Sequence, residues 1–73
     1  MIPLSMASEG KEVIITRITG KEETRRFLEN LGFVVGHTAT VVTEIEGSLI
    51  VNVKEARVAV GKEMANKIMV DMD

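Results

Sequence analysis

The sequence lacks several residue types, and each absence excludes a class of protein. It contains no cysteine, which excludes a disulfide framework and a thiolate metal site. It contains no tryptophan or tyrosine, so Phe27 and Phe33 are its only aromatic residues besides the single histidine. Grooves for proline-rich peptides and stacking surfaces for RNA are built from aromatic rings, so neither kind of binding is expected. The core must consist mainly of aliphatic and methionine side chains.

Concentrated positive charge and long apolar runs are also missing. Nine basic and eleven acidic residues give a net charge of −2, and the two signs are interspersed. A nucleic-acid-binding protein needs a concentrated positive field to displace counterions, so no nucleic-acid partner is expected. No apolar run is long enough to span a bilayer, and the first ten residues do not resemble a signal peptide. These features predict a cytoplasmic protein without membrane insertion.

The composition that remains is typical of one small folded domain, residues 1–73. Hydrophobic residues make up 45% and charged residues 27% of the chain, close to the averages of globular proteins. A domain of this size buries only about 60% of the surface that its unfolded chain exposes, so a catalytic cleft would compete with the core for side chains. The sequence has no phosphate-binding glycine motif and no nucleophile beside a base. We therefore expect no catalytic residues and no enzymatic activity.

Hydrophobic periodicity predicts a mainly β protein with one helix. A helix over Lys21–Leu31 is indicated by Phe27, Leu28 and Leu31, which share one helical face. Thr19 and Glu22 have the spacing of a capping box, and Gly32 follows as the C-terminal glycine. Short strands are predicted at Val13–Ile18, Thr38–Ile45, Leu49–Val53, Arg57–Val60 and Ile68–Val70.

The order of these elements predicts a small five-stranded SH3-like barrel. The helix is inserted after the first strand, and a short helical turn over Lys62–Asn66 precedes the last strand. Closing such a meander into a barrel removes its exposed edges. Apolar and polar residues do not alternate regularly in Val13–Ile18. Either both faces of this strand are covered, or a bulge moves the residues after it to the opposite face. A lead-in turn is expected over Met6–Glu9 with Ser5 as its cap, and Leu4 is expected to anchor this segment to the core.

Several motifs, in order along the chain, resemble the FeoA family (ferrous iron transport protein A). Residues 31–36, Leu-Gly-Phe-Val-Val-Gly, are similar to the LGFxPG signature of that family, with Val35 where proline is common. Ala65, Ile68 and Val70 are similar to its closing A-x-x-I-x-V pattern. The resemblance extends from Leu4 to Val70.

The resemblance implies a non-enzymatic accessory protein of ferrous iron uptake. Members of the family are thought to dock on the cytoplasmic part of FeoB, a membrane iron transporter that carries a GTPase domain. The same barrel occurs at the C-terminus of iron- and manganese-dependent repressors. The alternative implied function is therefore a transition-metal-binding regulatory domain for Fe²⁺ or Mn²⁺. We expect no required cofactor, and the alternative function implies weak binding of Fe²⁺ or Mn²⁺.

Two groups of residues are candidates for partner binding. Arg25 and Arg26 place positive charge on the exposed side of the predicted helix, where they either contact an acidic partner or pair with Glu29 and Glu22 at helical spacing. Val34, Val35 and Ile50 would form the best apolar contact surface if all three were exposed together.

Metal ligands are few. His37 is the only histidine, and a metal site needs two or three further ligands. The nearest acidic residues along the chain are Glu44 and Glu46, so a turn histidine is favoured and His37 is a weak metal-ligand candidate. The five methionines are scattered along the sequence rather than clustered, which disfavours ligation of a soft metal. Met64 and Met69 are expected to fill gaps in an aromatic-poor core.

Overall fold

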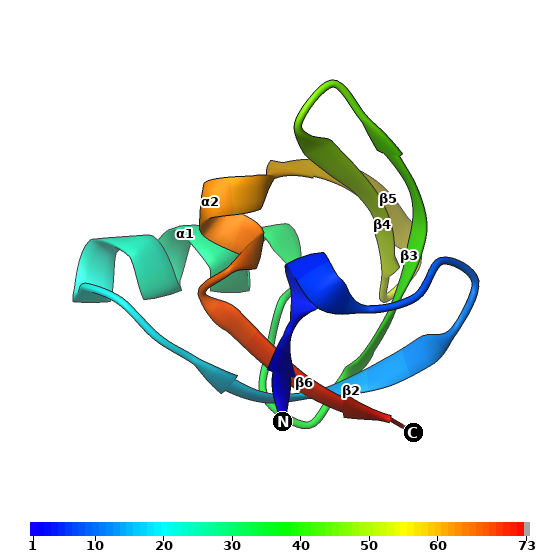
Figure 1. The fold of residues 1–73 in the computed structure, drawn as a ribbon. Coiled ribbons are helices and arrows are strands. Elements are labelled where there is room, and N and C mark those ends of the chain that lie inside the picture. Colours follow the sequence, from blue (N-terminus) through cyan, green and yellow to red (C-terminus); the bar gives the residue numbers. More distant parts are fainter. Residues whose placement is uncertain (73) are drawn as a thin grey trace.

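The computed structural model describes residues 1–72, in which six strands form one antiparallel sheet (Figure 1). Neighbouring strands follow the order β1-β6-β2-β3-β4-β5. The strands are β1 (Ile2–Pro3), β2 (Glu12–Ile18), β3 (Thr38–Ile45), β4 (Ser48–Val53), β5 (Ala56–Gly61) and β6 (Ile68–Met72). The helices are a 3₁₀ turn, η1 (Leu4–Met6), the helix α1 (Glu22–Leu31) and the short helix α2 (Lys62–Ala65).

The predicted SH3-like, mainly β architecture is confirmed, with one additional strand and with a sheet that stays open. The sheet curls strongly, and α1 and α2 lie on the side between its two ends (Figure 1). The additional strand β1 pairs with β6, with Ile2 opposite Val70. It is only two residues long because Pro3 has no N–H to donate to a ladder and the chain then turns into η1. At the opposite end of the sheet, β5 is the last strand of the ladder.

The core lies inside the curl of the sheet. Alternate residues of β2 to β6 point inward, as the period of a strand requires, and Leu28 of α1 and Ala65 of α2 are fully buried with them. The helices therefore supply the side chains that cover the core where the ends of the sheet do not meet. The buried strand residues are Val13, Ile15, Ala39, Val41, Leu49, Val51, Val53, Val60, Ile68 and Val70.

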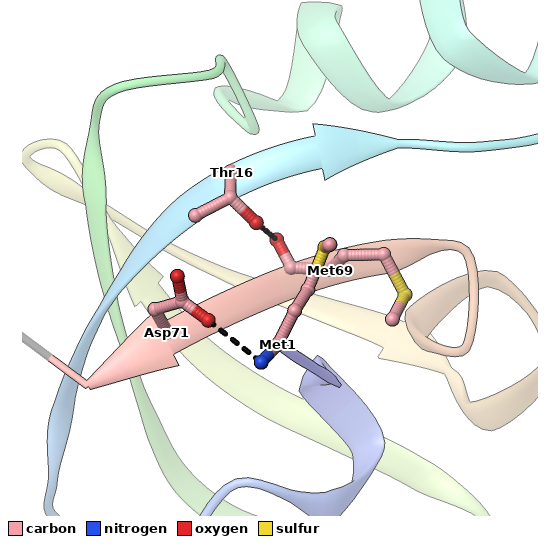
Figure 2. Close-up of polar contacts among 4 residues, drawn as sticks. All are labelled: Met1, Thr16, Met69 and Asp71. Carbon is pink, nitrogen blue, oxygen red and sulfur yellow. Dashed lines mark hydrogen bonds and ion pairs between the residues drawn. The ribbon is translucent and has the colours of Figure 1, made fainter.

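A bulge explains the imperfect alternation of the first predicted strand. The register between β2 and β6 shifts between Ile15 and Arg17, so Thr16 is the additional residue. Its hydroxyl donates a hydrogen bond to the carbonyl oxygen of Met69 at 3.2 Å (Figure 2). A second register shift, between Val41 and Thr43 in β3, has no counterpart in the sequence prediction.

The helix ends as predicted but begins differently. Gly32 has φ +112°, and the N–H of Phe33 donates to the carbonyl of Leu28 at 3.0 Å, which is the bonding of a glycine-terminated helix. The prediction of a capping box at Thr19 and Glu22 is wrong, because Lys21 occupies the N-cap position and its side chain makes no capping hydrogen bond. The hydroxyl of Thr19 instead donates to the carbonyl of Lys67 at 3.2 Å, so it joins the chain before α1 to the chain before β6.

Two further predictions concerning apolar and turn residues are wrong. Phe27 was expected on the buried face of the helix but is 50% exposed, because α1 turns Leu28 into the core and Phe27 lies about 100° from it around the helix axis. The lead-in turn forms at Leu4–Met6 rather than two residues later. Leu4 is buried as expected, and the hydroxyl of Ser5 bonds to the side chain of Asn66 rather than capping the turn.

Candidate functional site

His37 lies in a polar groove on the outer side of the sheet. Its backbone is fixed by two bonds, from its N–H to the Val34 carbonyl at 3.0 Å and from the Ile15 N–H to its carbonyl at 2.9 Å. The imidazole is exposed. We call the cavity of about 530 Å³ beside it the His37 groove, which is lined by Glu12, Gly36, His37, Thr38, Ala39, Thr40, Asn52 and Lys54.

The His37 groove offers two metal-ligating side chains, the imidazole of His37 and the carboxylate of Glu12. Glu12 reaches the groove because it is opposite Thr40 in the β2–β3 ladder. The acidic residues that the sequence suggested lie elsewhere: Glu44 pairs with Lys62 at 2.9 Å, and Glu46 occupies the turn after β3. Within residues 1–72 no three histidine or acidic side chains converge on a common metal position.

The two arginines of the helix are both exposed, and they differ in their contacts. Arg26 pairs with Glu22 at 2.7 Å, one helical turn away, as the spacing predicted. The corresponding pair of Arg25 with Glu29 is absent from the ion pairs of residues 1–72. The guanidinium of Arg25 is therefore available to an acidic partner without breaking an existing ion pair.

The three apolar interface candidates do not form one surface. Val35 is 57% exposed and Val34 is half-buried, and both precede the start of β3. Ile50 is half-buried on β4, where it is opposite Thr43 and Ala59. Five residues of extended chain separate Thr38 from Thr43 along β3, which is about 17 Å at the rise of a strand. Ile50 therefore belongs to a different part of the surface from Val34 and Val35.

An apolar groove that the sequence prediction missed lies where the first and last strands meet. We call it the terminal groove. It has a volume of about 350 Å³ and is lined by Met1, Ile2, Met6, Ala7, Ser8, Val13, Val70, Asp71 and Met72. Val13 and Val70 are core residues, so the groove opens directly onto the core.

The terminal groove concentrates exposed apolar side chains. Seven large hydrophobic residues are exposed within residues 1–72, and four of them, Met1, Ile2, Met6 and Met72, line this groove. The amino group of Met1 pairs with the Asp71 carboxylate at 2.9 Å across the β1–β6 pair (Figure 2). Methionine side chains adapt their shape to varied apolar partners, so this groove is suited to contact with an apolar surface.

The methionines explain why the groove escaped prediction. Met72 is far from Met1 and Met6 in the sequence, and the pairing of β1 with β6 brings the three to one groove. The one available signal was the unusual number of methionines near the two ends of the chain. Met64 packs against the core, as predicted for a gap-filling residue.

No helix within residues 1–72 has the length and hydrophobicity needed to cross a membrane.

Comparison with known proteins gives one consistent result. Residues 2–72 match the FeoA domain family. A protein of Methanocaldococcus jannaschii named "Putative Fe(2+) transport protein A" is 34% identical over 71 residues, which cover 97% of this chain and 87% of that protein. A crystal structure of an iron uptake regulatory protein, FeoA, has a TM-score of 0.88 at 34% identity, covering 96% of this chain and 93% of the other.

Two more distant structures share the fold. FeoA of Stenotrophomonas maltophilia complexed with zinc, described as an SH3 domain protein, has a TM-score of 0.83 at 23% identity, covering 97% of this chain and 91% of the other. A manganese-dependent transcriptional repressor in complex with manganese has a TM-score of 0.87 at 22% identity, covering 96% of this chain and 35% of the repressor. The match over residues 2–72 and the 34% identity across nearly the whole chain establish that this protein belongs to the FeoA family.

Proposed function

We propose that this protein is a non-enzymatic accessory component of ferrous iron uptake that docks on the cytoplasmic part of a FeoB-type transporter. The observation that carries the proposal is the terminal groove, because exposed apolar side chains gathered around a cavity are typical of a surface that contacts another protein. Family membership indicates which process the contact belongs to. The protein acts in the cytoplasm through this contact.

We propose two parts for the surface that contacts the transporter, the terminal groove and the arginines of α1. The terminal groove supplies the apolar contact, with Met6 and Met72 at its rim. Arg25 and Arg26, on the helix, contact an acidic region of the transporter, since arginine is enriched in protein interfaces. Val34, Val35 and Ile50 remain proposed partner-binding residues, although they belong to two separate parts of the surface.

Titration of the ¹⁵N-labelled protein with the isolated cytoplasmic domain of FeoB tests the proposal. We expect shift changes at residues of the terminal groove and weaker binding by Met72→Ser, whose side chain is 68% exposed and can be replaced without a cavity in the core. Met64→Leu, at a methionine packed on the core, is the matched control and should bind as the unmodified protein does. An absence of shift changes at high concentrations of the FeoB domain would contradict docking.

A second candidate function is weak binding of Fe²⁺ or Mn²⁺ at the His37 groove. It is favoured by the presence of Glu12 and His37 in one groove, and similar folds occur in complexes with zinc and manganese. Imidazole and carboxylate are suitable ligands for such ions, and water would complete the coordination. Two protein ligands make a weak site.

Paramagnetic broadening by Mn²⁺ distinguishes a site from non-specific binding. We expect broadening confined to residues around Glu12, His37 and Thr40, and its loss in the His37→Ala variant. Broadening that is uniform over the surface, or that persists in His37→Ala, would contradict a metal site in this groove.

A further inference from the structure

The backbone of β5 has one hydrogen-bonding edge with which no other strand of residues 1–72 pairs. The geometry of this edge follows from a single backbone hydrogen bond. The N–H of Lys62 donates to the carbonyl of Gly47 at 3.0 Å, and the register places Ser48 opposite Gly61. Residues opposite each other in an antiparallel ladder alternate between hydrogen-bonded and non-hydrogen-bonded pairs. Counting from the bonded pair of Gly47 and Lys62, the bonded residues of β5 are Val60, Val58 and Ala56.

The three residues that alternate with these, up to Lys62, point their backbone groups away from β4. These are Arg57, Ala59 and Gly61. The register between β4 and β5 has no irregularity, so the alternation holds along the whole strand. No described residue outside the strand ladders accepts a hydrogen bond from these three N–H groups, and the sheet ends at β5. The outer edge of β5 is therefore unpaired.

This edge is also accessible. Arg57, Ala59 and Gly61 are all exposed. Gly61 consists of backbone alone, so its exposure is exposure of the backbone itself. A Cβ added at Gly61 would meet no atom within 4 Å, and Ala59 has only a methyl group. Two small residues thus leave room for another strand to approach the edge closely.

We infer that this edge pairs with the same edge of a second copy of this chain, in an antiparallel arrangement centred on Ala59. A two-fold axis at Ala59 places Arg57 opposite Gly61 of the second copy, and Val58 opposite Val60. Like charges directly opposite each other destabilise a strand pair, and this register contains none. The absence of a side chain at Gly61 also leaves space for the arginine across from it.

The outer face of the strand supports the same register. The Arg57 side chain donates a hydrogen bond from Nε to Asn52 Oδ1 at 3.0 Å. This bond holds the guanidinium over β4 and away from the edge, so Arg57 does not block an approaching strand. The pairing would continue the sheet of one molecule into that of the other and is independent of docking on FeoB.

The association should be weak. One strand pair of this length buries much less than the ~1,200 Å² of a stable interface, so a dissociation constant on the order of 1 mM is expected. Wild-type protein is therefore compared between about 0.05 mM and about 2 mM, which lie on either side of that value. We expect concentration-dependent shifts and slower hydrogen exchange at the amides of Arg57, Ala59 and Gly61, and a rising average mass in sedimentation equilibrium.

Two substitutions at one position test the assignment. Ala59→Pro removes an N–H that points away from β4, a position at which an edge strand tolerates proline, and it should abolish the concentration dependence. Ala59→Ser keeps the N–H and a small side chain, and should retain it. The wild-type comparison decides the question even if the proline variant unfolds. A constant mass and unchanged amides up to about 2 mM would overturn the inference, as would shifts confined to the terminal groove.

Discussion

Replacing Gly32 by alanine is expected to destabilise the protein by about 2–5 kcal/mol, from two separable causes. Gly32 has φ +112°, and a left-handed backbone costs an L-residue about 1–2 kcal/mol. A Cβ at this position would also lie 3.3 Å from Cγ1 of Val53. Val53 is itself in the core and has little freedom to move, and overpacking of this kind costs about 1–3 kcal/mol.

Gly36→Ala separates the two causes. Gly36 also has a positive φ, +94°, but a Cβ there would meet nothing within 4 Å, so only the backbone cost of about 1–2 kcal/mol applies. The loss at Gly32 should therefore exceed the loss at Gly36 by the cost of contact with Val53.

Urea unfolding followed by circular dichroism measures both losses, since the chain has no tryptophan for fluorescence. A small domain unfolds with a free energy of only about 5–10 kcal/mol, so a loss of about 2–5 kcal/mol moves the midpoint clearly. In a thermal scan each kcal/mol corresponds to about 4–8 °C. Equal destabilisation by Gly32→Ala and Gly36→Ala would refute the close packing of the helix end on β4.

Other expected outcomes concern single side chains. Phe33→Ala should destabilise the protein by about 3–5 kcal/mol, because a fully buried ring is lost. Phe27→Ala, at the half-exposed ring, should cost clearly less in the same urea titration, and equal losses would contradict the orientation of α1. Arg26→Ala should cost at most about 0.5 kcal/mol, since an exposed ion pair at this spacing contributes about that much, and a difference from wild type that is unchanged in high salt would speak against the pair. Thr19→Val should cost about 0.5–1.5 kcal/mol through the bond to the Lys67 carbonyl, and amide exchange should increase at the start of β6; unaltered exchange there would argue against that bond.

The sequence predicts most of the architecture because strand and helix periods are local properties. The five predicted strands and the helix all form, and Gly32 and Leu4 have the predicted roles. The strand β1 was missed because two residues are too few to show the alternation of apolar and polar residues that indicates a strand. The inward position expected for Phe27 failed because adjacent residues on a helix cannot both face a narrow core.

The candidate sites were harder to predict because they depend on pairing between distant strands. The register of β2 with β3 places Glu12 in the groove that His37 also lines. Proximity along the chain suggested Glu44 instead, which is paired with Lys62. The terminal groove depends on β1 and β6 being neighbours. Neither relation is visible in the spacing of residues along the sequence.

The position of β2 between β6 and β3 has a consequence for how the chain folds. The hairpins formed by β3, β4 and β5 join residues close in sequence, so they can assemble early. β2 must instead wait for β6, since Val13 is opposite Met72 and Ile18 is opposite Ile68. Closing so long a loop before any contact is gained slows folding. During synthesis β2 therefore lacks one of its two neighbours until the final strand has been made.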